Sequence, residues 1–113
     1  MTYSEERPWG SFETICSGPK YKVKVISVKP HSRLSLQKHE HREEHWVVVG
    51  GVGTITVGDQ TVPAYPGTTA FIPPGEVHRL EAEDKELTLI EVQRGSQLYE
   101  EDITRLSDDY GRK

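Results

Sequence analysis

Hydrophobic and polar positions alternate with a period of two along most of this 113-residue chain. Segments rich in β-branched residues recur about every eight to twelve residues, with turn residues between them. The predicted strands include Tyr21–Val28, Trp46–Val49, Gly53–Val57, Thr61–Ala64, Thr68–Ile72 and Leu87–Val92. This spacing is typical of an all-β sandwich or barrel, because one flat sheet of this size would leave edges and an apolar face open.

Glycine and proline mark the turns between these segments. A short hairpin is predicted at Gly58-Asp59, with other turns at Gly50-Gly51, Pro66-Gly67 and Pro73-Pro74-Gly75. Only Tyr99–Leu106 favours helix, because the acidic residues near its start suit a helix N-terminus. We therefore predict one all-β domain over residues 1–113 that ends in a short helical turn.

Composition narrows the possible partners. The chain has 14 Lys and Arg against 18 Asp and Glu without a run of like charges, so we expect no nucleic-acid partner. The apolar stretch Trp46–Val49 is too short to span a membrane, and the N-terminus lacks the pattern of an export signal. We expect a soluble, cytoplasmic protein without a membrane partner. Its one cysteine, Cys16, is predicted to be a buried small hydrophobe.

The residues that carry chemistry are concentrated in the segment Leu34–Trp46, which contains three histidines. In an extended strand, one face of this segment would present only nitrogen and oxygen donors, from Gln37, His39 and His41. A second segment, Gly67–His78, ends in a histidine just after a tight turn. Imidazole, carboxylate and amide donors suit zinc, manganese, iron or nickel better than copper(I) or calcium. These segments predict a site for one divalent metal ion.

Both segments resemble the two sequence motifs of the cupin family. The second motif, G-x5-P-x-G-x2-H-x3-N, fits at Gly67, Pro73, Gly75 and His78, with Ala82 where the family often has asparagine. The resemblance implies a single double-stranded β-helix, or jelly-roll, barrel. It also implies that His78 is a metal ligand.

The first cupin motif, G-x5-H-x-H-x3,4-E-x6-G, places its glutamate at Glu44, and counting back gives His39 and then Gln37. The resemblance therefore implies that the metal ligands are Gln37, His39, Glu44 and His78. Strand parity leaves His41 as an alternative to Gln37, and the motif spacing favours Gln37. His45 should point to the opposite face and is expected to be structural.

A glutamine at this ligand position resembles the phosphomannose isomerases in particular. Similar segments extend along nearly the whole chain and include Arg7–Phe12, His41–Val49, Val77–Glu81, Glu91–Ser96 and Tyr110–Arg112. The chain looks like the C-terminal isomerase domain of the bifunctional type II mannose-6-phosphate isomerase/mannose-1-phosphate guanylyltransferases, without the nucleotidyltransferase domain. The resemblance implies interconversion of mannose 6-phosphate and fructose 6-phosphate. Zinc is the preferred candidate for the metal, and manganese, iron, nickel and cobalt are the alternatives.

Isomerisation of an aldose to a ketose through a cis-enediol needs a base within hydrogen-bond reach of the migrating proton. The candidates are His41 and Glu91, whereas a hydride shift would need no base. Glu91 and Gln93 share strand parity and are expected either to line the barrel or to form an internal hydrogen-bonded pair.

Arg79 follows the candidate ligand His78 and is the first candidate for binding a sugar phosphate, because a guanidinium fork matches phosphate oxygens. A surface salt bridge is the equal alternative for Arg79. Lys38 and Arg42 are weaker candidates that we expect to lie in solvent.

Two other classes of function stay open. One is a metal-bound, sugar-binding module without catalysis. The other is a different small cupin enzyme such as an iron dioxygenase, against which Gln37 argues, because such enzymes usually bind iron through histidines and a carboxylate. We also expect a homodimer, because a small open barrel leaves strand edges to cover. Trp9 and Trp46 are expected to be core or interface residues, and Arg7–Phe12 to be the main dimer contact.

Overall fold

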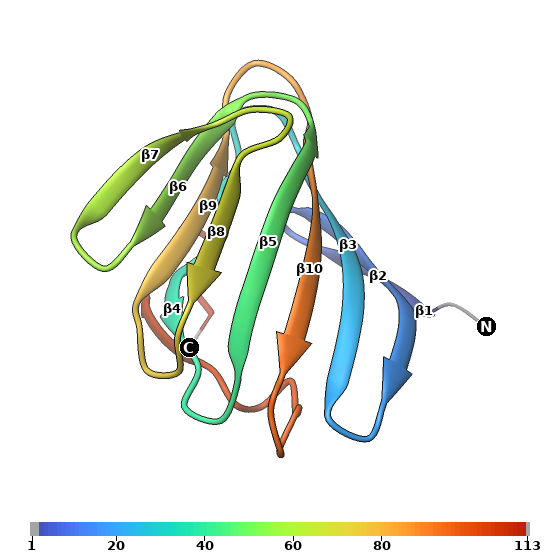
Figure 1. Cartoon of the computed structure of the whole chain (residues 1–113). Coiled ribbons are helices and arrows are strands. Elements are labelled where there is room, and N and C mark those ends of the chain that lie inside the picture. Colours follow the sequence, from blue (N-terminus) through green and yellow to red (C-terminus); the bar gives the residue numbers. More distant parts are fainter. Residues whose placement is uncertain (1–2, 113) are drawn as a thin grey trace.

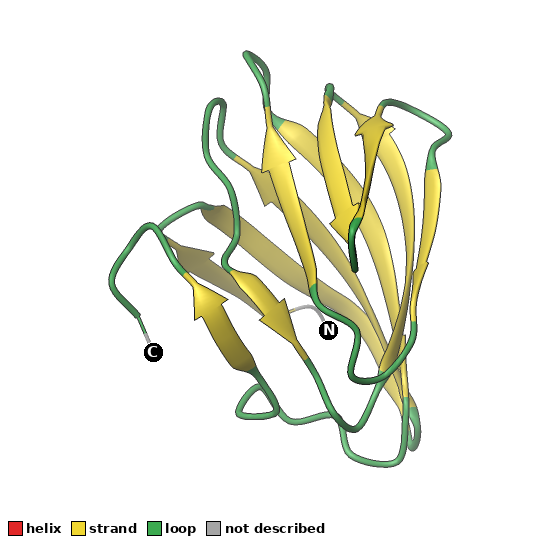
Figure 2. Cartoon of the chain, turned by 90° about the vertical axis from the view of Figure 1, so that its left-hand side faces the viewer, coloured by secondary structure: helices red, strands yellow, loops and turns green. Residues whose placement is uncertain are grey.

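The computed structural model describes residues 3–112, which form eleven strands and no helix (Figure 2). The strands build two antiparallel sheets, with orders β1-β2-β3-β10-β5-β8 and β11-β4-β9-β6-β7 (Figure 1). The strand bounds are β1 Tyr3–Arg7, β2 Gly10–Gly18, β3 Tyr21–Val28, β4 Leu36–Lys38, β5 Glu43–Gly50, β6 Gly53–Val57, β7 Gln60–Ala64, β8 Thr69–Ile72, β9 His78–Ala82, β10 Leu87–Arg94 and β11 Thr104–Ser107.

The interior changes from apolar to polar along the barrel. On β10 the buried side chains alternate with exposed or half-buried ones, and they run from Leu87 and Leu89 to Glu91 and Gln93. The antiparallel neighbour β5 shows the same gradient in reverse, from buried Glu44 through Trp46 to Val48. On both strands the buried residues change from apolar to polar in the same direction along the barrel. One end of the barrel is therefore filled by a hydrophobic core, whereas the other end presents buried polar groups.

The all-β prediction is confirmed, and each of the six predicted segments lies in or around an observed strand. The predicted bounds Tyr21–Val28 and Gly53–Val57 coincide with those of β3 and β6. These segments have the clearest pattern of β-branched residues, so local propensity and tertiary pairing favour the same conformation there.

The predicted helical turn at Tyr99–Leu106 is wrong. Residues 100 and 101 form a turn, and the chain then continues into β11, which pairs antiparallel with β4. A helix of this length has a high nucleation cost, whereas the neighbouring strand offers backbone partners. The acidic residues instead make side-chain contacts: the Glu100 carboxylate lies 2.7 Å from the Lys24 ammonium.

The prediction that Cys16 is buried is also wrong, because its side chain is exposed. The pairing of β2 with β3 shifts register between Thr14 and Cys16. Such a bulge changes which face the following side chains point to, so the inward alternation that buries Phe12 does not continue to the cysteine.

The exposed apolar side chains include a group on the outer face of the six-stranded sheet. Val47, Val49 and Phe71 are 42%, 51% and 51% exposed. Trp9 and Phe12, in the segment expected to form the dimer contact, are instead buried in the core. None of the described residues forms a helix long and apolar enough to span a membrane.

Candidate metal centre and pocket

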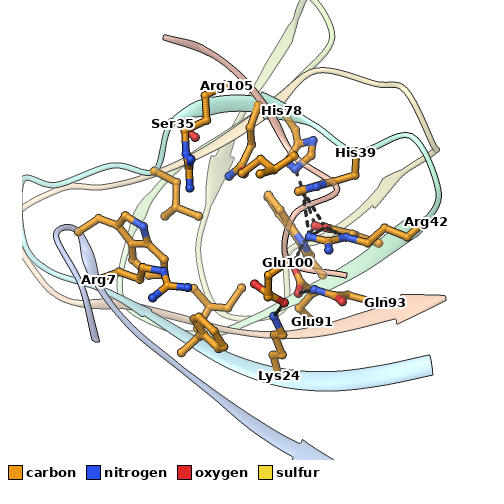
Figure 3. Close-up of a pocket in the computed structure, with 18 of the residues that line it drawn as sticks. Arg7, Lys24, Ser35, His39, Arg42, His78, Glu91, Gln93, Glu100 and Arg105 are labelled. Carbon is orange, nitrogen blue, oxygen red and sulfur yellow. Dashed lines mark hydrogen bonds and ion pairs between the residues drawn. The ribbon is translucent and has the colours of Figure 1, made fainter. Parts of the chain in front are cut away.

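The polar end of the barrel contains a pocket between the two sheets (Figure 3). Its walls come from strands far apart in the sequence and from the segment that leads into β11. The lining residues used below are Arg7, Lys24, Gln37, His39, Arg42, Glu44, Trp46, His78, Glu91, Gln93, Glu100, Arg105 and Arg112.

Three buried side chains meet in this pocket with ligand atoms within 4.8 Å of one another: His39, Glu44 and His78. His39 follows β4, Glu44 lies near the start of β5, and His78 begins β9. The imidazole Nε2 atoms of His39 and His78 lie 3.3 and 3.8 Å from the two carboxylate oxygens of Glu44. This buried group can hold a metal ion.

The hydrogen bonds of both histidines prepare them as metal ligands. Nδ1 of His39 lies 2.6 Å from the carbonyl oxygen of Asp102, and Nδ1 of His78 lies 3.0 Å from that of Glu76. A carbonyl oxygen only accepts, so each Nδ1 carries the proton and each Nε2 lone pair is left to face Glu44. Such outer contacts fix the tautomer in metal sites, and the donor set therefore fits a divalent ion.

Burial also keeps these imidazoles neutral. Loss of hydration, followed by the positive charge of Arg42, lowers the pKa of His39 to about 4. Burial likewise lowers the pKa of His78. A neutral imidazole is the form that binds a metal ion, so both side chains are in the required state at neutral pH.

Gln37 lies beside this group. Its side chain is buried and lines the same pocket, and it faces His78 in the pairing of β4 with β9. The structure therefore brings the four predicted ligands together.

The Glu44 carboxylate is held by two further side chains. Arg42 donates from Nε to Oε2 over 2.9 Å, and Trp46 donates from Nε1 to Oε1 over 3.0 Å. The expectation that Arg42 lies in solvent is wrong, because it is buried and lines the pocket. It has the same strand parity as Glu44, and its guanidinium points into the barrel next to that carboxylate.

Glu91 and Gln93 line the pocket, as predicted, and they are also hydrogen-bonded to each other. Trp46 Nε1 donates to Glu91 Oε2 over 3.1 Å, and Gln93 Nε2 donates to Glu91 Oε1 over 2.7 Å. Burial, and then the negative charge of Glu44, raises the pKa of Glu91 to about 8. This buried carboxyl group therefore holds a proton more strongly than a solvated one.

His41 and Arg79 lie outside this pocket's lining. Strand β4 ends at Lys38, so the parity expected for His41 does not continue, and its side chain is exposed. Arg79 alternates with buried residues of β9 and donates to the backbone carbonyls of Leu34 and Ser107. His45 points to the opposite face, as expected, and lies 2.6 Å from the Glu43 carboxylate.

Sequence reasoning missed several basic residues of the pocket: Arg7, Lys24, Arg105 and Arg112. Lys24 lies two residues before buried Ile26 on the same strand, so strand alternation could have predicted that it points into the barrel. The others lie near the two ends of the chain. Their approach to the pocket follows from the pairing of β1 with β2 and of β11 with β4, for which the sequence carries no distinct motif.

Two antiparallel sheets that enclose a buried histidine and glutamate group define a cupin barrel. The fold is similar to that of oxalate decarboxylase from Bacillus subtilis, with a TM-score of 0.83 and 16% identity, over 93% of this chain and 30% of that one. It is also similar to the Schizosaccharomyces pombe Cnp3 cupin domain, with a TM-score of 0.71 and 13% identity, over 75% of this chain and 64% of that one. At these identities the likeness concerns the fold alone.

The family follows from the sequence comparisons. Residues 2–108 match the model of the mannose-6-phosphate isomerase C-terminal family, and the chain belongs to this family. It is 50% identical over 107 residues to the alginate biosynthesis protein AlgA of Pseudomonas aeruginosa and 46% identical over 107 residues to the mannose-1-phosphate guanylyltransferase ManC of Salmonella typhimurium. The matches cover 94% of this chain but only 22% of each of these relatives.

Proposed function

We propose that this domain is a metal-dependent isomerase that interconverts mannose 6-phosphate and fructose 6-phosphate. The observation that carries the proposal is the buried group of His39, Glu44 and His78 in one pocket with the carboxyl group of Glu91. A metal site and a protonatable group next to it are the two components that an aldose–ketose isomerase requires. Membership of the isomerase family supports the same chemistry.

In this proposal the metal is held by Gln37, His39, Glu44 and His78, with zinc first and manganese, iron, nickel or cobalt as alternatives. When bound, the ion supplies Lewis-acid stabilisation for the oxygens of the sugar. Arg42 and Trp46 keep the Glu44 carboxylate in place through the hydrogen bonds that they donate to it.

Glu91 is the proposed base that moves the proton between the two adjacent carbons. Its carboxyl group faces the pocket, and donors from Trp46 and Gln93 fix its orientation while leaving lone pairs for a substrate proton. His41, the other candidate base, is exposed outside this pocket, which favours Glu91.

Arg7 and Arg105 are proposed to receive the phosphate group in place of Arg79. Both line the pocket, and Figure 3 draws them on the side away from Arg42 and Gln93. A guanidinium group matches phosphate oxygens in charge and geometry. This arrangement would place the phosphate at one side of the pocket and the reacting carbons beside Glu91.

A coupled assay for fructose 6-phosphate, run with the metal-depleted protein and a panel of added divalent ions, tests the proposal. We expect turnover that depends on the added metal and that His78→Ala abolishes. Metal and sugar phosphate binding without turnover would instead support a non-catalytic sugar-binding module. A requirement for iron and oxygen would support an oxygenase.

A further inference from the structure

Arg42 Nη1 and Gln93 Oε1 are buried polar atoms of this pocket that have no hydrogen-bond partner among residues 3–112. Their side chains are only 7% and 1% exposed. Buried polar groups are nearly always hydrogen-bonded, and an unpaired one costs free energy unless a ligand or water completes it. Two such atoms in the same pocket therefore point to a ligand group.

The remaining polar atoms of both side chains are already used. Arg42 donates from Nε to Glu44 over 2.9 Å, and its Nη2 lies 3.1 Å from the bare Nε2 of His39. Gln93 donates from Nε2 to Glu91. The hydrogen bonds to Glu44 and Glu91 hold both side chains in place even when a metal ion takes the His39 lone pair, so the unpaired atoms are preorganised rather than free to turn toward solvent.

Gln93 lies near the end of β10, and Arg42 immediately precedes the neighbouring strand β5. Gln93 pairs with Glu44 across β10 and β5, and Arg42 comes two residues before Glu44, so it shares its inward parity. Figure 3 draws Arg42 and Gln93 on the same side of the pocket, beside His39 and Glu91. Both side chains therefore lie beside the candidate metal ligands.

The chemistry of the pair selects the ligand group. A guanidinium nitrogen only donates, and an amide oxygen only accepts. Carboxylate or sulfate oxygens only accept, so they would satisfy Arg42 and leave Gln93 unpaired, whereas a hydroxyl group accepts from one and donates to the other. We infer that Arg42 and Gln93 form a recognition site for ligand hydroxyls, which directs the polyol portion of the ligand to this side of the pocket.

This inference deepens the proposed function and assumes its pocket, but it is tested by binding alone. The probes are mannitol 6-phosphate, which carries hydroxyls and a phosphate but no carbonyl to isomerise, and sulfate, an anion that only accepts hydrogen bonds. Isothermal titration of the metal-loaded protein gives both affinities. Gln93→Met, which keeps the length of the side chain without its polar atoms, should weaken mannitol 6-phosphate binding about 10- to 100-fold. It should leave sulfate binding unchanged.

Gln60→Met, at an exposed glutamine in β7, is the matched control and should bind both probes as the wild type does. Arg42→Lys keeps the charge and should also weaken binding of mannitol 6-phosphate more than binding of sulfate. Metal content measured on every variant shows whether the site is intact. Equal affinities of wild type and Gln93→Met for mannitol 6-phosphate would overturn the inference.

An equal loss of both probes in Gln93→Met would overturn it as well, because the pair would then act on the anion. The inference is also overturned if the wild type binds mannitol 6-phosphate no better than sulfate. Selective polyol binding by a protein without isomerase turnover would leave this inference standing and remove the proposed function, so the two failures are distinguishable.

Discussion

Gln37 lies directly opposite His78 in the antiparallel pairing of β4 with β9. The two residues lie on either side of the β6–β7 hairpin in the sequence, yet the register of β4 and β9 makes them direct neighbours. Because a slip of one residue would turn Gln37 to the other face, the candidate metal centre depends on this pairing as much as on the identity of its ligands.

Metal analysis of protein purified without chelator should find close to one divalent ion per chain. His39→Ala and His78→Ala should each lose most of it, since each removes one of only two imidazole donors in the buried group. The control is His45→Ala, because His45 is exposed on the opposite face and should not affect the ion. Full metal content in either of the first two variants would refute the site.

A second metal measurement decides whether Gln37 or His41 is the metal ligand. Gln37→Ala should weaken metal binding by about 10- to 100-fold, as the loss of a neutral amide ligand would. His41→Ala should retain the ion, because His41 is exposed outside this pocket. The opposite result, an empty site in His41→Ala and a filled one in Gln37→Ala, would show that the motif alignment is off by two residues.

The ligand segment shows how far the sequence could predict the site. Motif spacing grouped Gln37, His39, Glu44 and His78, and all four line one pocket. Strand parity failed for His41, because the strand ends after Lys38 and local periodicity does not show where pairing stops. The contacts of Arg42 depend on side chains from other strands, so residue spacing alone could not reveal them.

For the fold as well, the sequence predicted the features that depend on local pattern and missed those that depend on pairing between strands. Segments with a strong β-branched pattern, such as Tyr21–Val28, were predicted with their observed bounds. The C-terminal segment was assigned to the wrong element because its acidic residues satisfy local helix rules, whereas β11 is stabilised by pairing with β4. The exposure of Cys16 depends on a bulge, which the sequence does not mark.

The ion pair between Asp108 and Arg112 should make stability depend on pH. Hydrogen bonds from Arg112 lower the pKa of Asp108 to about 2, below the value of 3.8 expected when unfolded. The contribution is therefore present above pH 3.8 and is lost as the pH falls toward 2. Asp108→Asn should lower the free energy of unfolding by about 1 kcal/mol at pH 7, allowing for solvent screening.

Urea unfolding at pH 7 and near pH 2.5 measures this effect. The difference between Asp108→Asn and wild type should shrink at the lower pH, because the wild-type carboxylate begins to be protonated there. The exposed Asp84 provides the control, and Asp84→Asn should have little effect at either pH. A difference that does not change with pH would contradict the account.

We also expect a homodimer, with its contact on the outer face of the six-stranded sheet. Strand β8 lies at the edge of that sheet, and exposed Phe71 on β8 pairs with His45 of β5, two residues from exposed Val47. A second copy can cover both the open strand edge and these apolar side chains. Trp9 is unsuitable for this contact because it is buried within its own chain.

Sedimentation velocity at micromolar concentration checks the oligomeric state. Phe71→Glu should give a monomer, because it places a charge in the expected contact. Val62→Glu changes an exposed valine on β7, at the edge of the other sheet, and should stay dimeric. A monomeric wild type would contradict the prediction, and a dimeric Phe71→Glu variant would move the contact elsewhere.

The most direct test of the central claim is to follow mannose 6-phosphate by NMR in the presence of the metal-loaded protein. We expect fructose 6-phosphate signals to appear, and Glu91→Gln to form them about 10²- to 10⁴-fold more slowly, because an amide cannot take up the migrating proton. Unchanged sugar signals with each divalent ion bound to the wild type would contradict the isomerase function. Equal rates for wild type and Glu91→Gln would contradict the role of Glu91 as the base.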